Sequence, residues 1–163
     1  EAAGGRPVHS RVGHAFVKRA MREQGAIFAM ELSGHYYYSD LHYNDNGLRT
    51  LVELINIVSA EDKPLSELIK PFLRYPTSGE INLKVADRQK VLTALENKYR
   101  EGRIDHLDGL SVDYPDWWFN ARSSHTESIL RVNIGATNKT LLSDKSKVML
   151  ADIENISKDL SHG

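Results

Sequence analysis

Cysteine is absent from the 163-residue chain. Disulfides and thiolate metal sites both need cysteine sulfur, so the sequence excludes both. The chain also lacks any apolar run near the roughly 20 residues that a membrane-spanning helix needs, so we expect no membrane partner. No signal-peptide pattern is visible, and the opening sequence reads like the middle of a domain, so we expect a piece of a longer protein.

An excess of charge of one sign is lacking as well. The chain has 22 acidic and 21 basic residues and a net charge of −1. Binding to a nucleic-acid backbone needs a basic surface, so we expect no nucleic-acid partner. With 40% hydrophobic and 26% charged residues, the composition is that of a globular protein with one ordinary domain or two small ones.

Apolar residues in the first half recur mostly with a helical period, interrupted by short strand-like runs. Gly25 is a suitable helix stop, and the turn at 44–47 is a helix-start signal. The predicted elements are a short strand at 8–11, a helix over 12–22, strands at 26–28 and 36–38, a helix from 48 to about 62, and a short helix from Pro64.

The second half predicts the order β-α-β-β-β-α, an α+β unit in which helices pack on an antiparallel sheet. Asp87 is a suitable helix cap, and Asp108-Gly109 favours a hairpin turn. Strands are expected at 81–85, 110–114, 117–121 and 129–136, and helices over 88–99 and from about 140 onward. Residues 74–79 are rich in turn-formers and predict a linker, so we divide the chain into 1–77 and 78–163.

Polar groups gather in the stretch ELSGH at 31–35. The carboxylate of Glu31 and the hydroxyl of Ser33 suit the vicinal hydroxyls of a sugar, and in extended chain both would point the same way. Gly34 allows a sharp turn or a close approach to a ligand. From the residues alone, a polar loop without a binding role is the commoner explanation.

A second polar stretch begins at Arg122, between two predicted strands. Its guanidinium can bind phosphate oxygens in a bidentate manner, and Ser124 and Thr126 add hydroxyl donors. An ordinary polar hairpin is the alternative. The seven histidines show no metal-ligand spacing, so we predict no metal site within the chain.

Both stretches resemble motifs of one family. ELSGH at 31–35 resembles the sugar-binding loop G-E-x-S-G-H of the α-D-phosphohexomutases, and RSSHTESILR at 122–131 resembles their phosphate-binding loop R-x-S-N-T-E-P-x-L-R. The bacterial phosphomannomutase/phosphoglucomutase branch is most similar. The resemblance covers nearly the whole chain. It implies the end of domain 3 over 1–77, a partial α/β domain, and domain 4 over 78–163, with a TATA-binding-protein-like fold.

The resemblance also implies site residues. A third stretch resembles x-G-H-x-x-I-K-x-x-M and places His14 toward the active site as a catalytic candidate. The implied sugar-binding residues are Glu31, Ser33 and His35, and the implied phosphate-binding residues are Arg122, Ser124, His125 and Thr126.

Three positions depart from the family motifs. His125 replaces asparagine and Ser128 replaces proline, so phosphate binding is expected to become pH-dependent and the loop looser. Met30 replaces glycine, so the backbone before Glu31 is expected to approach the sugar less closely.

The implied activity is reversible phosphoryl transfer between hexose 1-phosphate and 6-phosphate through a bisphosphate, in a cytoplasmic enzyme. The family uses a phosphoserine loop, T-A-S-H-N-P, and a Mg²⁺ loop, D-G-D-G-D-R, and this chain contains neither. Ser124 is therefore not the phosphoserine, and the isolated chain is expected to be inactive. The alternatives are a non-catalytic phosphosugar-binding module, a nucleic-acid or protein interaction module, and a phosphoglucosamine mutase. Leu32 argues against the last, which often carries glutamine there.

Overall fold

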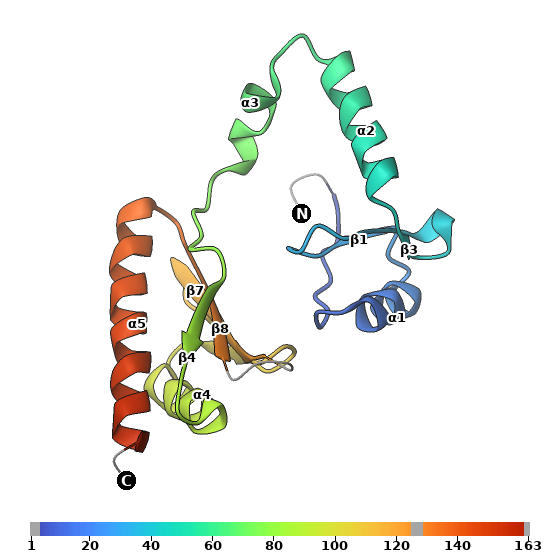
Figure 1. Ribbon diagram of the computed structural model, residues 1–163. Helices are drawn as coiled ribbons and strands as arrows, with labels where there is room; N and C mark the ends of the chain where they lie inside the picture. The colour runs from blue at the N-terminus through green and yellow to red at the C-terminus, as the bar shows by residue number, and fades with distance from the viewer. Residues whose placement is uncertain (1–3, 125–128, 162–163) are drawn as a thin grey trace. The chain divides into compact units, whose positions relative to one another are not determined.

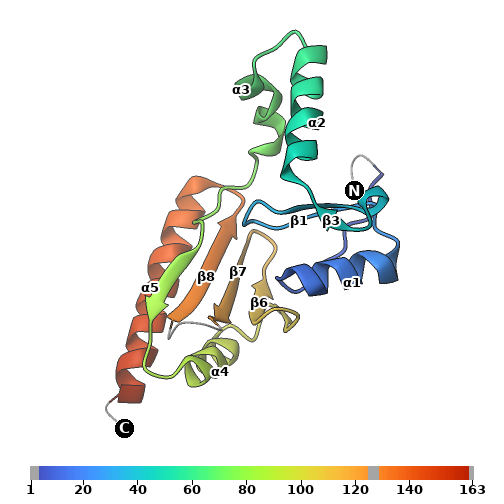
Figure 2. The same ribbon diagram turned by 45° about the vertical axis from the view of Figure 1, so that its right-hand side comes forward.

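The computed structural model describes residues 4–124 and 129–161. The chain divides into two compact units, Glu1–Ile69 and Lys70–Gly163, which are described separately (Figures 1 and 2). Within the described residues, no helix combines the length and the apolar character needed to cross a membrane.

The first unit is a small antiparallel sheet with strand order β1-β2-β3, with one helix before it in the chain and two after it. Phe28 pairs with Tyr38 and Met30 with Tyr36, so β1 and β2 form a tight hairpin. The elements are α1 (His14–Gln24), β1 (Phe28–Met30), β2 (Tyr36–Tyr38), a 3-10 turn η1 (Ser39–Leu41), β3 (Asn44–Asp45), α2 (Gly47–Ala60) and α3 (Leu65–Leu68).

Capping residues mark the end of α1 and the start of α2. Gly25 ends α1 in the left-handed conformation with φ 63°. The side chain of Asn46 accepts a hydrogen bond from the backbone N–H of Arg49 at the start of α2. Two strand predictions were wrong: residues 8–11 form no strand, and the strand expected at 26–28 begins only at Phe28.

The core of the first unit is small. Val17 and Met21 of α1 pack with Tyr37 of β2, and these are the buried residues of its cluster. None of the residues of α2 is buried, and its predicted apolar stripe is largely exposed, with Leu48 78% exposed. The pattern therefore predicted the helix correctly, although the described part of the first unit does not cover its apolar face.

The second unit is a five-stranded antiparallel sheet with strand order β4-β8-β7-β6-β5. Four strands lie between its two long helices, one more than predicted, because the Asp108-Gly109 hairpin contributes two. The elements are η2 (Lys70–Phe72), β4 (Ile81–Lys84), α4 (Arg88–Lys98), β5 (Arg103–Asp105), β6 (Leu110–Asp113), β7 (Trp117–Ser123), β8 (Ile129–Ala136) and α5 (Lys139–Ser161).

Alternate residues of the central strands face the helices and form one core. Phe119, Ile134 and Met149 are fully buried in it. Figure 2 shows α5 running along the sheet beside β8. The buried Asp152 of α5 ties the two helices together, since it accepts hydrogen bonds from Lys98 at 2.7 Å and from Tyr99 at 2.6 Å. The predicted α+β class, an antiparallel sheet with helices packed on it, is confirmed.

The segment before β4 is attached to the sheet. Thr77 forms a bridge with Gly135, and the N–H of Ser78 donates to the carbonyl of Ile134 at 2.8 Å. The unit boundary lies between Ile69 and Lys70, eight residues before the predicted division. Part of the predicted linker therefore extends the edge of the sheet.

Candidate functional site

The stretch ELSGH forms the turn of the hairpin between β1 and β2. The N–H of Glu31 donates to the carbonyl of His35, and the N–H of Gly34 donates to the carbonyl of Glu31, both at 3.0 Å. Gly34 has φ 85°, which is the left-handed position of such a three-residue turn. Ser33 lies within this turn, so the expectation of extended chain from Glu31 to Ser33 was wrong.

The carboxylate of Glu31 joins three elements. It accepts a hydrogen bond from the N–H of Gly13, just before α1, at 2.8 Å, and another from the hydroxyl of Tyr37 on β2. Burial acts to raise the pKa of Glu31, but these two hydrogen bonds and the nearby imidazoles of His14 and His35 outweigh it and lower the pKa. Burial and the Glu31 carboxylate raise the pKa of Tyr37 in turn. Glu31 is thus held ionised and fixed in place.

His35 is oriented by a carboxylate that the sequence analysis did not identify. Its Nδ1 lies 2.7 Å from Oδ2 of Asp45, whose Oδ1 accepts from the N–H of Tyr36 at 2.8 Å. The hydrogen bond from His35, with that from Tyr36, lowers the pKa of Asp45. An ionised carboxylate only accepts hydrogen bonds, so Nδ1 of His35 donates, and in the neutral imidazole Nε2 is the acceptor.

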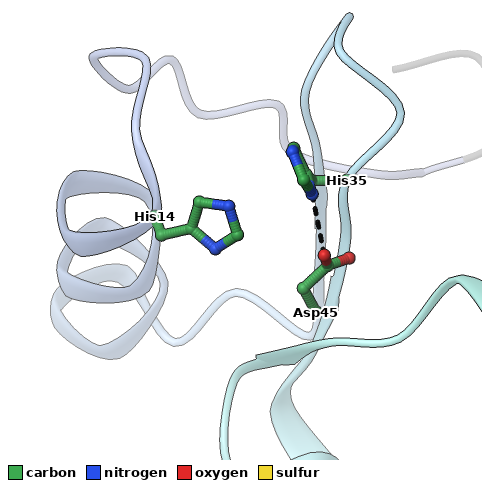
Figure 3. A group of neighbouring side chains, drawn as sticks. All are labelled: His14, His35 and Asp45. Atoms are coloured by element: carbon green, nitrogen blue, oxygen red, sulfur yellow. Dashed lines mark hydrogen bonds and ion pairs between the residues drawn. The ribbon is translucent and has the colours of Figure 1, made fainter.

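His14, the first residue of α1, completes this cluster. Its ring centroid lies 4.5 Å from that of His35 and 5.4 Å from that of Tyr37, edge-on in both cases. Figure 3 shows the His14 ring facing the His35–Asp45 pair. The structure therefore brings together His14, Glu31 and His35 of the predicted residues, and adds Tyr37 and Asp45.

The second candidate region lies at the end of β7. The strand continues to Ser123, two residues beyond its predicted end, so Arg122 belongs to the strand and pairs with Arg131 of β8. Both arginines bind the carboxylate of Glu80, with N–O distances of 3.1 Å from Arg122 and 3.6 Å from Arg131. Two guanidinium groups thus converge on one anionic group.

Ser124 follows directly after β7 and is buried. Its N–H donates to the carbonyl of Ile129 at 3.0 Å, and its carbonyl accepts from Nη1 of Arg88 at 2.9 Å. The predicted phosphate-binding residues His125 and Thr126 lie outside the described residues. The described part of the region therefore consists of Arg122 and Ser124 with the neighbours Glu80, Arg131 and Arg88.

Comparisons with known proteins show the family to which the chain is similar. Residues 1–75 match the family described as "Phosphoglucomutase/phosphomannomutase, alpha/beta/alpha domain III". A phosphomannomutase of Methanocaldococcus jannaschii is 39% identical over 145 residues, 89% of this chain and 32% of that protein. A phosphomannomutase of Escherichia coli K12 is 40% identical over 136 residues, 82% of this chain and 30% of that protein.

A solved structure shows the same similarity in three dimensions. The crystal structure of a phosphoglucomutase/phosphomannomutase family protein from Burkholderia thailandensis superposes with a TM-score of 0.79 and 29% identity, over 95% of this chain and 34% of that one. The chain belongs to the phosphoglucomutase/phosphomannomutase family. It spans about a third of the length of the relatives it matches.

Proposed function

We propose that this chain is the sugar- and phosphate-binding part of a phosphohexomutase, the C-terminal portion with residues 1–77 from domain 3 and 78–163 from domain 4. The complete enzyme would interconvert hexose 1-phosphate and 6-phosphate through a bisphosphate. Its substrate would be a mannose or glucose phosphate, and its location cytoplasmic. The names of the relatives and the family match of residues 1–75 support this assignment.

The observation that carries the proposal is the arginine pair on β7 and β8. Arg122 and Arg131 converge on the Glu80 carboxylate, which shows that their positions suit an anion. Guanidinium groups pair with phosphate oxygens in the same way as with carboxylate oxygens. A substrate phosphate would take the place of Glu80 or share the arginines with it, assisted by Ser124, His125 and Thr126.

The hairpin cluster supports the sugar-binding half of the proposal. Glu31 is ionised and fixed, and each carboxylate oxygen has a further lone pair for a sugar hydroxyl. Ser33 is exposed in the turn and can donate to a second hydroxyl. His35, oriented by Asp45, can accept a proton at Nε2 from a hydroxyl that attacks phosphorus, with His14 beside it.

Mg²⁺ belongs to the proposed complete enzyme and not to this chain. Mg²⁺ takes oxygen ligands in octahedral geometry, whereas the metal-ligating group among the described residues contains two imidazoles and one carboxylate. This donor set does not fit Mg²⁺. The chain's own contribution is to position the sugar and the phosphate that does not react, which is a large part of phosphoryl-transfer catalysis.

Two alternative functions predict different results in activity and binding assays. A non-catalytic phosphosugar-binding module would bind the same ligands without an associated mutase activity in the complete protein. A phosphoglucosamine mutase would turn over glucosamine phosphate in preference to mannose or glucose phosphate. Assaying the complete protein on all three sugar phosphates separates these possibilities.

The test is the mutase activity of the complete enzyme with Arg122 replaced. We expect Arg122→Ala to lower kcat/KM by at least about 100-fold, since removing two charge-assisted hydrogen bonds costs about 3 kcal/mol or more. Arg122→Lys keeps the charge but loses the planar fork, so partial activity should remain. Arg103→Ala is the matched control, because Arg103 pairs with Asp113 in an exposed position on β5. Equal kcat/KM in Arg122→Ala and wild type would refute the proposal.

A further inference from the structure

We propose that His14, His35 and Asp45 form a binding site for a zinc-class divalent ion. The three residues come from α1, the turn before β2, and β3, and one ligand atom of each lies within 4.8 Å of the others. In Figure 3 the His14 ring lies beside the hydrogen-bonded His35–Asp45 pair. Metal binding by this cluster does not depend on the proposed mutase function.

The donor atoms define the class of ion. Two imidazole nitrogens and one carboxylate oxygen are a common set of three protein ligands for Zn²⁺, with the fourth position open to water or another ligand. Imidazole also suits Cu²⁺ and Ni²⁺, whereas Mg²⁺ and Ca²⁺ prefer sites made of oxygen. The site should therefore select zinc-class ions against Mg²⁺.

Neighbouring residues hold the side chains of His14 and Asp45 in place. Oδ1 of Asp45 accepts from the N–H of Tyr36, and the ring of His14 lies edge-on to the buried Tyr37. His14 and Asp45 are exposed, so an ion can reach the site from solvent. The nearby Glu31 carboxylate, fixed by Gly13 and Tyr37, adds negative charge that favours a cation.

Binding of a metal ion requires a local rearrangement of the His35–Asp45 pair. Nδ1 of His35 and Oδ2 of Asp45 are 2.7 Å apart and share a proton. If both ligate the ion through these atoms, the ion replaces that proton and Nε2 takes up a proton, so His35 stays a neutral imidazole in its other tautomer. If His35 ligates through Nε2, Asp45 keeps its hydrogen bond and a water takes its place on the ion.

The proposal differs from the sequence expectation that the chain holds no metal site. The spacings 14, 35 and 45 match no metal-binding motif, and only the pairing of β2 with β3 brings Asp45 beside His35. One consequence rests on the proposed function: since His14 and His35 also belong to the proposed sugar site, a bound ion would compete with the sugar.

The test is calorimetric titration of ZnCl₂ into the 163-residue chain, with excess MgCl₂ present throughout. We expect one saturable site, and at least about tenfold weaker binding in each of His14→Gln, His35→Gln and Asp45→Asn, by analogy with other metal sites. The matched control is His106→Gln, because His106 also pairs with a carboxylate, Glu96 at 3.2 Å, but has no second imidazole in its pair. This control should bind zinc like wild type.

A second measurement tests the proposal even if the variants fail to fold. In the wild-type chain, ¹⁵N NMR of the imidazoles should show zinc-dependent shifts at His14 and His35 before any other histidine. The proposal is overturned by the absence of a saturable site, by displacement of zinc by Mg²⁺, by an equal loss of binding in His106→Gln, or by shifts confined to other histidines.

Discussion

At the residue scale, the hydroxyl of Tyr37 helps to keep the carboxylate of Glu31 ionised. Tyr37 is fully buried and donates its hydroxyl proton to the Glu31 carboxylate. That hydrogen bond is among the interactions that keep the pKa of Glu31 below its ordinary value, against the opposing effect of burial. The proposed sugar site therefore depends on Tyr37, which the sequence analysis placed in a strand but did not name as a site residue.

We predict that Tyr37→Phe raises the pKa of Glu31 toward or above its ordinary value of about 4.3. Removing the donor should also cost about 1–3 kcal/mol of unfolding free energy in the first unit. The pKa is measured by ¹³C NMR titration of the Glu31 carboxyl. Tyr36→Phe is the control, because Tyr36 lies beside Tyr37 on β2, whereas the hydroxyl that donates to Glu31 is that of Tyr37. An unchanged Glu31 pKa in Tyr37→Phe would contradict this account.

The pH dependence of stability follows from the same shifts. Because Glu31 and Asp45 have lowered pKa values in the folded state, their stabilisation is fully present above about pH 5 and is lost as pH falls through the lowered values, below about 4. We predict that the unfolding free energy of the first unit decreases below about pH 4. The decrease should be smaller in Asp45→Asn, measured by denaturant unfolding at a series of pH values.

The sequence alone identified part of the site in the first unit. From the residues it singled out Glu31 and Ser33 as groups that suit sugar hydroxyls, and the family resemblance added His14 and His35. Asp45 was missed because residues 44–47 were interpreted only as the start of a helix. Glu80 was missed because it lies 42 residues before its partner Arg122 in the sequence. Such partners depend on strand pairing, which local sequence patterns do not determine.

At the element scale, the hairpin between β5 and β6 sits against the strand that carries Arg122. Gly109 has φ 78°, and a Cβ there would lie 2.5 Å from the carbonyl oxygen of Ala121 and 2.9 Å from Cα of Arg122. Both are backbone atoms of β7, which cannot yield as a side chain would. The turn therefore needs glycine both for its conformation and for space.

We predict that Gly109→Ala lowers the unfolding free energy of the second unit by about 2–4 kcal/mol, from left-handed strain and the clash together. Gly79→Ala isolates the strain, because Gly79 has φ 67° and no heavy atom within 4 Å of the added Cβ. It should cost only about 1 kcal/mol. Equal losses in the two variants, measured by urea unfolding, would show that the contact with β7 is unimportant.

Helix ends could be predicted from the sequence where a capping residue marks them. Gly25, Asn46 and Asp87 carry local capping chemistry, and each marks a helix end in the structure. Strand ends depend on partners: β7 runs on to Ser123 because it pairs with Leu130 of β8. The β3 strand of two residues has no pattern of its own and exists through its pairing with β2.

At the scale of the whole molecule, the two units have very different cores. Among the described residues, the buried cluster of the first unit has three members, whereas that of the second has thirteen. Burial of apolar surface is the main favourable term in folding, and the apolar stripe of α2 stays exposed. The second unit should therefore be the more stable.

We predict two separate thermal transitions for the chain, with the first unit unfolding at the lower temperature. A polypeptide of residues 70–163 should reproduce the higher transition, because it contains the complete sheet with α4 and α5. Differential scanning calorimetry of both polypeptides tests this. A single transition in the full chain, with residues 70–163 unfolded alone, would show that the units depend on each other.

The central claim is that this chain binds a sugar phosphate without transforming it. The most direct measurement is ³¹P NMR of mannose 1-phosphate, and separately of glucose 1-phosphate, with the pure chain added. The account predicts that the 1-phosphate resonance shifts or broadens with wild type, does so far less with Arg122→Ala, and that no 6-phosphate resonance appears. A resonance unaffected by the wild-type chain, or the appearance of hexose 6-phosphate, would contradict it.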